Sequence, residues 1–109
     1  MKKVFFYFLL FSVFVINAQI AERPLPERLY NNLSKEFPDF LNPDEAEALE
    51  EKLERFSNET SNQICVVIVD DLNGMDASSY AIKLGNEWGV GNKKFNNGIV
   101  ILIKPTGGN

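Results

Sequence analysis

Residues 62–71 read NQICVVIVDD, and this stretch decides the class of fold. Its residues 64–69 are all apolar, and all except Cys65 are β-branched. The run is too short for a buried helix and lacks polar alternation, so it predicts a strand that is covered on both faces. Such strands are typical of parallel sheets with helices on either side. Cys65 is then interpreted as a small buried hydrophobic residue.

An amphipathic helix is predicted immediately before this strand. Asn42 can cap a helix that begins at Pro43 and ends near Ser57, and Glu45 can reach back to the N–H of Asn42. Apolar residues recur at spacings of three and four, at Ala46, Leu49, Leu53 and Phe56. Because exposed charges are the default on a helix, its acidic residues are expected on a solvated face: Glu47, Glu50, Glu51 and Glu54.

A second helix and a second strand follow. Asp76 can cap a helix whose apolar stripe ends at Trp88, and Gly85 inside that helix favours a close packing contact. Residues 98–104, GIVILIK, contain a second apolar run and are interpreted as another buried strand. Strand, helix and strand form a βαβ unit with parallel pairing and a right-handed crossover. The sequence therefore predicts an α/β fold, a Rossmann-like αβα sandwich with a βαβ core.

The chain begins with a pattern typical of a secretory signal peptide, which we assign to residues 1–18. Two lysines precede an apolar run at residues 4–16, and cleavage is expected after the small residue Ala18. The mature protein is then extracytoplasmic, either periplasmic or secreted, and touches a membrane only if the segment stays uncleaved. Residues 19–38 carry three prolines among charges and are interpreted as a tether with a helical turn at residues 29–37. The α/β domain is assigned to residues 39–109.

Charge and composition exclude several classes of function. The net charge is −4, and loss of Lys2 and Lys3 with the leader lowers it to −6. An acidic domain without a basic cluster is a poor match for nucleic acid but is compatible with a divalent cation. The sequence has no histidine, which excludes a Ser-His-Asp or Cys-His triad. Its single cysteine excludes an internal disulfide.

Residues 87–104, EWGVGNKKFNNGIVILIK, contain glycines and lysines that suggest a phosphate-binding loop. Such loops follow a strand and open a helix, whereas these glycines follow a helix and precede a strand. Gly89 is therefore interpreted as the helix stop, and Asn97 with Gly98 as a turn into the strand. Lys93 and Lys94 are expected to be exposed loop charges.

Taken together, these motifs resemble the TPM domain family. The family includes a thylakoid lumen protein linked to photosystem II repair, an acetylcholine-receptor modulator and bacterial envelope proteins. The resemblance runs from about residue 37 to residue 104 and is carried by Asp39, Leu41, Gln63, Ile64, Trp88, Gly89, Gly91, Asn97 and Gly98. This chain has Asn96 where the family usually has an acidic residue. The family's downstream strand pair and closing helices are not found after Asn109, so the fold is expected to be incomplete at its C-terminus.

The resemblance implies an extracytoplasmic α/β sandwich of Rossmann-like character, with calcium binding and acid phosphatase activity in some members. In open α/β sheets, ligands bind beyond the carboxyl ends of the strands. Asp70 and Asp71 end the first predicted strand, and Asp39 can approach the same edge. With the loop at Asn97 they are our candidate ligands for calcium, or alternatively magnesium. The open alternative is structural, with Asp70 and Asp71 forming the turn after the strand and Asp39 a local cap.

Two functions follow from these observations. The first is a non-catalytic envelope module that binds a divalent cation and a protein partner, and that assists assembly or maintenance of membrane complexes. The second is a phosphomonoesterase in which an ion held by Asp70 or Asp71 polarises a phosphoryl oxygen. We favour the first because the sequence offers no histidine and no evident nucleophile.

Overall fold

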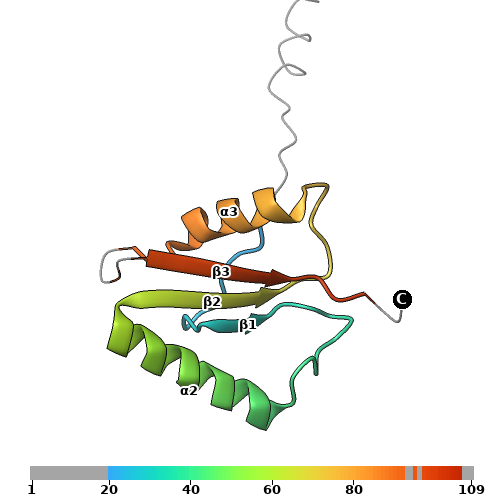
Figure 1. The fold of residues 1–109 in the computed structure, drawn as a ribbon. Helices are drawn as coiled ribbons and strands as arrows, with labels where there is room; N and C mark the ends of the chain where they lie inside the picture. Colours follow the sequence, from blue (N-terminus) through green and yellow to red (C-terminus); the bar gives the residue numbers. More distant parts are fainter. Residues whose placement is uncertain (1–19, 93–94, 96, 107–109) are drawn as a thin grey trace, which may run out of the picture.

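The computed structural model describes residues 20–92, 95 and 97–106, which form a parallel sheet with a helix on each face (Figure 1). The elements in chain order are β1 (Tyr30–Asn32), α2 (Pro43–Thr60), β2 (Asn62–Ile68), α3 (Ala77–Trp88) and β3 (Asn97–Ile103). The strand order is β1-β2-β3, and both pairs are parallel. The predicted α/β fold with a βαβ core is confirmed. The predicted signal peptide at residues 1–18, the two loop lysines at 93 and 94, and Asn96 lie outside the described residues.

β2 is the centre of the sheet and its most buried strand. Cys65, Val67 and Val69 pack on the α3 side, whereas Val66 and Ile68 pack on the α2 side. All five are buried, which explains the unbroken apolar run. The predicted burial of Cys65 is confirmed, and this burial raises the pKa of its thiol to about 11.

The two crossover connections have opposite hands. The chain steps in the same direction along the sheet from β1 to β2 and from β2 to β3. The two helices nevertheless cover opposite faces (Figure 1). For a given direction of step, the hand of a crossover decides which face its helix covers, so only one of the two units obeys the right-handed preference.

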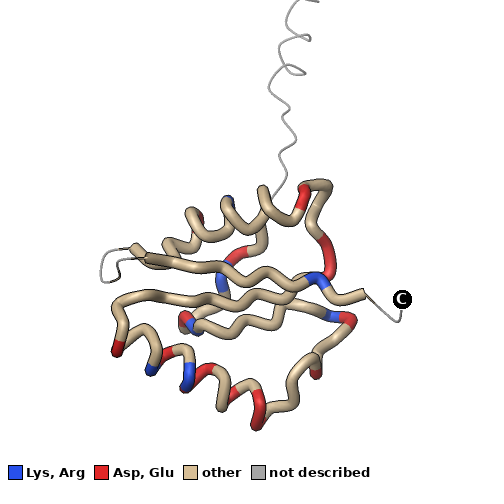
Figure 2. Tube along the Cα trace, in the orientation of Figure 1, with Lys and Arg blue, Asp and Glu red and all other residues tan. Residues whose placement is uncertain are grey.

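Local sequence sets the start of α2 as predicted. The side chain of Asn42 accepts a hydrogen bond from the Glu45 N–H at 2.8 Å, and Glu45 Oε1 accepts from the Asn42 N–H at 3.2 Å. The helix runs to Thr60, slightly beyond the predicted end, and Ser61 caps it with a φ of 62°. Figure 2 shows charged residues repeating along this helix. The expectation of a fully solvated acidic face is wrong for Glu50, which is only 2% exposed.

The segment before α2, interpreted above as a tether, is part of the domain. Instead of a helical turn at residues 29–37, residues 30–32 form β1, with Tyr30 opposite Val66 in register. Leu29 and Tyr30 are buried beside Leu53 of α2. A strand forms here because the carboxylate of Glu50 accepts hydrogen bonds from the backbone where β1 begins.

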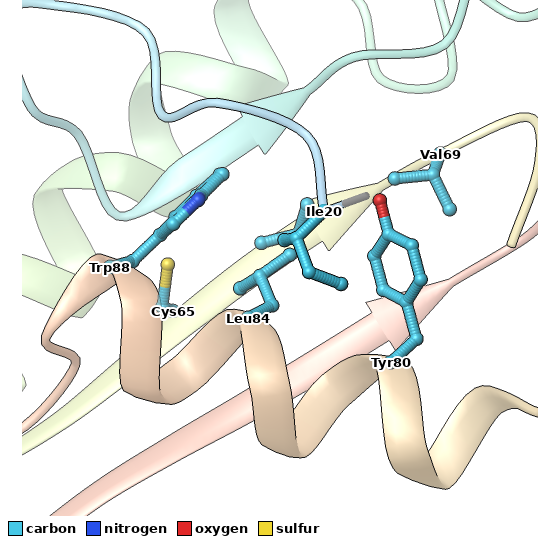
Figure 3. Packing of buried hydrophobic residues seen from close by; sticks show 7 residues of the cluster. Ile20, Cys65, Val69, Tyr80, Leu84 and Trp88 are labelled. Carbon is cyan, nitrogen blue, oxygen red and sulfur yellow. The ribbon is translucent and has the colours of Figure 1, made fainter. Parts of the chain in front are cut away.

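The start of the described chain is fastened to α3. Ile20 lies in the core beside Tyr80 and Leu84 (Figure 3). The Ala21 N–H donates to Tyr80 Oη at 3.2 Å, and Trp88 Nε1 donates to the Ala21 carbonyl at 2.9 Å. Residues 20–23 therefore form a strap across the helix rather than a free linker.

β3 is the edge strand of the described sheet and is less buried than predicted. Val100 and Leu102 pack on the α3 side. On the other face, Ile99 is 49% and Ile101 44% exposed. The reason is that α2 packs against β1 and β2 and leaves this face of β3 uncovered.

Gly85 of α3 makes the close contact that the sequence suggested. A Cβ at this position would lie 3.2 Å from Val100 Cγ2, so the helix packs closely on β3. Neither of the helices in the described part of the chain has the length and apolar character needed to cross a membrane.

Candidate functional site

The structure brings three of the four candidate ligands to one edge of the sheet. Asp70 and Asp71 follow the carboxyl end of β2, and Asp39 lies in the loop that joins β1 to α2. Asn97 is the first residue of β3 and lies opposite Asn62, so it marks the amino edge. A strand of this length spans about 20 Å at about 3.3 Å per residue. Asn97 therefore lies at the opposite edge of the sheet from the three aspartates.

Asp70 fastens the loop after β1 to the end of β2. Its Oδ1 accepts from Ser34 Oγ at 2.6 Å, and its Oδ2 accepts from the Lys35 N–H at 2.7 Å and the Glu36 N–H at 3.3 Å. Ser34 Oγ in turn accepts from the Phe37 N–H at 2.8 Å. These hydrogen bonds, with that from Ser34 the largest cause, lower the pKa of Asp70.

The Asp70 contacts predict an acid-sensitive loop. Because the folded-state pKa lies below the ordinary value of 3.8, the stabilisation is complete above that pH and is lost as the pH falls through the lower folded-state value. We expect hydrogen-exchange protection of the Lys35 amide to fall in that window, and Asp70→Asn to remove this pH dependence. A Lys35 amide equally protected throughout the acid range would contradict the assignment.

Asp71 and Asp39 also sit in turns. Asp71 Oδ1 accepts from the Asn73 N–H at 2.9 Å. Asp39 lies in a turn closed by the Phe40 N–H and the Phe37 carbonyl at 3.1 Å, and Asn32 Nδ2 donates to that same carbonyl at 2.9 Å. Both aspartates are exposed. Within residues 20–92, 95 and 97–106, no three His, Cys, Asp or Glu side chains are grouped closely enough to hold a metal ion. An ion at this edge would need carbonyl or water oxygens as well.

Sequence reasoning missed the buried carboxylate of Glu50. Its Oε1 accepts from the Tyr30 N–H at 2.7 Å, and its Oε2 accepts from the Leu29 N–H at 2.9 Å. Arg28 Nε lies 3.9 Å from Oε1. A hydrogen bond with Glu50 raises the pKa of the neighbouring Glu54. The position of Glu50 in the sequence could have indicated its burial, because it directly follows Leu49 and lies three residues before Leu53, beside the apolar stripe of α2.

The amino edge of the sheet contains a cavity of about 520 Å³ whose walls include Arg23, Gln63 and Trp88. Arg23 Nη1 donates to the Trp88 carbonyl at 3.3 Å, and the guanidinium carbon lies 5.3 Å from the centroid of the Trp88 ring. The positive charge of Arg23 thus interacts favourably with the negative, C-terminal end of the α3 dipole. These contacts hold the strap in place, and we assign Arg23 a structural role.

Gly91 and Gly98 are in backbone contact. A Cβ on Gly98 would lie 2.6 Å from the carbonyl carbon of Val90, and a Cβ on Gly91 would collide with the Gly98 nitrogen. Gln63 Oε1 accepts from the Gly91 N–H at 2.8 Å, which ties this turn to β2. The glycines therefore permit close backbone packing. Gly89 ends α3 as predicted, whereas Asn97 and Gly98 are the first residues of β3 rather than a turn before it.

The parallel sheet, with a helix on each face and polar loops at its carboxyl edge, defines an α/β domain built from βαβ units. The TPM domain family matches residues 35–108, and the chain belongs to that family. β1 and the strap precede the matched region. A comparison with curated proteins found no match.

Proposed function

We propose that this TPM domain acts outside the cytoplasm as a module that binds calcium at the carboxyl edge of its sheet. The observation that carries the proposal is the tie between Asp70 and residues 34–36, because it orders the loop that continues to Asp39. Asp39 and Asp71 are then the exposed carboxylates available to an ion. In this assignment, Asp70 is a positioning residue.

Calcium suits this edge better than magnesium. Calcium accepts variable numbers of oxygen ligands in flexible geometry, whereas magnesium requires a near-ideal octahedron. Two carboxylates on turns supply little negative charge and do not form a rigid coordination site. We therefore propose a weak site, with a Kd on the order of 10⁻⁴–10⁻³ M as in other extracellular modules.

A calcium titration followed by NMR tests the site. We expect amide shifts at Asp39, Asp71 and residues 34–37 that saturate at millimolar calcium, because the ion contacts those loops. Asp39→Asn together with Asp71→Asn should weaken calcium binding at least about tenfold, because the double variant lacks both exposed carboxylate charges. A tenfold change in Kd corresponds to about 1.4 kcal/mol.

Glu59→Gln is the matched control for this titration. Glu59 is an exposed acid near the end of α2, far from the carboxyl edge, so its loss should leave the affinity unchanged. Shifts spread evenly over the acidic residues, or no shifts at millimolar calcium, would remove the proposed site.

We further propose that the exported module contacts a protein partner in an envelope complex. The apolar run at residues 4–16 supports export, and the acidic balance supports a partner whose contacting surface is basic. This part of the proposal rests on the sequence and on the family resemblance.

The phosphatase alternative has weaker support. Its best hydroxyl at this edge is Ser34, which is 7% exposed and already donates to Asp70 while accepting from Phe37. A hydroxyl that both donates and accepts a structural hydrogen bond in this way is a poor nucleophile. Turnover of a model phosphomonoester by the purified protein, abolished by Asp71→Asn, would favour the alternative.

A further inference from the structure

The chain contains two Asn-Gly pairs, and the fold holds them in different surroundings. Asn73 and Gly74 lie in the loop between β2 and α3, whereas Asn97 and Gly98 are the first residues of β3. In such a pair the backbone nitrogen of the glycine is unhindered and can attack the side-chain amide carbon of the asparagine. Attack requires the peptide between the two residues to rotate, so the fold decides which pair reacts.

The Asn73-Gly74 pair forms an exposed turn that can open. Both residues are exposed, and their φ values of 54° and 83° fit the type I′ turn that favours Asn-Gly. The Met75 N–H closes the turn by donating to the Leu72 carbonyl at 3.0 Å. A Cβ at Gly74 would meet no atom within 4 Å in the described part of the chain. Rotation of this peptide therefore disrupts the turn hydrogen bond but meets open space on the glycine side.

The Asn97-Gly98 pair is held in the sheet. Asn97 pairs with Asn62 of β2, and Gly98 pairs with Gln63. Asn97 Nδ2 also donates to Asn62 Oδ1 at 3.1 Å. The turn before β3 packs directly on this peptide, because a Cβ on Gly91 would collide with the Gly98 nitrogen. The same rotation here would break strand pairing and meet backbone atoms.

We propose that Asn73 is a site of spontaneous deamidation in the folded protein and that Asn97 is protected. The Gly74 nitrogen loses its proton to a base in solution and attacks Asn73 Cγ. The new C–N bond closes a cyclic imide, and the side-chain nitrogen takes up a proton and leaves as ammonia. Water then opens the imide at either carbonyl, which gives aspartate or isoaspartate. Both products replace a neutral amide by a carboxylate.

Deamidation adds a negative charge at the carboxyl edge of the sheet. Asp71 Oδ1 accepts from the Asn73 N–H at 2.9 Å, so the new carboxylate arises close to that of Asp71. Calcium affinity depends on the number of charged ligands. In the proposed calcium site, the reaction adds a third carboxylate to those of Asp39 and Asp71 and tightens binding as the protein ages. This second step rests on the proposed function, whereas the reaction itself does not.

Peptide mapping by mass spectrometry of the purified protein, aged in solution, tests the reaction. We expect deamidation at Asn73 to be at least about tenfold faster than at Asn97, because Asn97 reacts only when the sheet opens. The rate at Asn73 should rise with pH, since the attacking nitrogen must lose a proton. In urea the two pairs should react at similar rates. Equal rates in the folded protein, or no reaction at Asn73 while the unfolded protein reacts, would overturn the proposal.

The Asn73→Asp variant tests the link to calcium. In the NMR titration it should bind calcium more tightly than the native protein. Asn97→Asp is the matched control, since it adds the same charge at the opposite edge and should leave the affinity unchanged. Thermal melting verifies that both variants are folded. Equal affinities of Asn73→Asp and the native protein would overturn the link to calcium. If neither protein binds calcium, the proposed function fails, and the deamidation rates still decide whether Asn73 is a reactive site.

Discussion

Glu50→Ala is expected to lower the free energy of unfolding by about 3–5 kcal/mol. The Glu50 carboxylate is almost fully buried and accepts from the N–H groups of Leu29 and Tyr30. Its removal leaves both donors buried without a partner, at about 1–3 kcal/mol each, and adds a small cavity. Because these donors lie where β1 begins, we expect β1 to separate from the sheet before the rest of the domain unfolds.

Urea denaturation measures the loss, and hydrogen exchange locates it. The amides of Leu29 and Tyr30 should lose protection first in Glu50→Ala. The pKa of Glu54, raised chiefly by its hydrogen bond with Glu50, should fall toward its ordinary value of 4.5 in the same variant. Glu51→Ala changes an exposed neighbour on α2 and should stay within about 0.5 kcal/mol of the native protein. Equal effects of the two substitutions would show that Glu50 does not hold β1.

Gly98→Ala is expected to cost about 3 kcal/mol, at the upper end of the usual overpacking penalty. The new methyl group would lie 2.6 Å from the Val90 carbonyl carbon and 2.9 Å from the Gly91 Cα. Both neighbours are backbone atoms, so relief requires the turn before β3 to move. Thermal melting should show the loss, and the Gly91 amide should lose its hydrogen bond to Gln63.

Gly85→Ala provides the matched comparison. The added methyl group there approaches only Val100 Cγ2, at 3.2 Å, and that side chain can shift. The helix also gains about 1 kcal/mol from replacing glycine, which offsets the crowding. We expect a change of less than about 1 kcal/mol. Similar losses for the two substitutions would mean that backbone contact is not what requires glycine at position 98.

The features predicted correctly from sequence depend on short-range interactions. Asn42 and Asp76 cap helices through residues three positions away, and the apolar run around Cys65 predicts a covered strand by itself. β1 was missed because it has three residues and needs a carboxylate twenty positions further along the chain. Local propensity contains no information about that contact.

The candidate site was predicted in part, for a geometric reason. The carboxyl ends of parallel strands share one edge, so the predicted strand and loop order placed Asp70 and Asp71 where the structure has them. The same rule places Asn97 at the opposite edge, because the amino ends of parallel strands lie there. What the sequence did not contain was the set of hydrogen-bond partners of Asp70, which come from the loop after the unpredicted strand β1.

The depth of Cys65 has a consequence under the proposed export of this domain to an oxidising compartment. A lone thiol outside the cell can join two molecules through a disulfide, but only as the thiolate and only when a reagent reaches it. Cys65 is fully buried in the centre of the sheet, and its pKa is raised to about 11. Oxidation therefore requires β2 to be exposed. The rate at which disulfide-linked dimers of this protein form would therefore report how often the domain unfolds around Cys65.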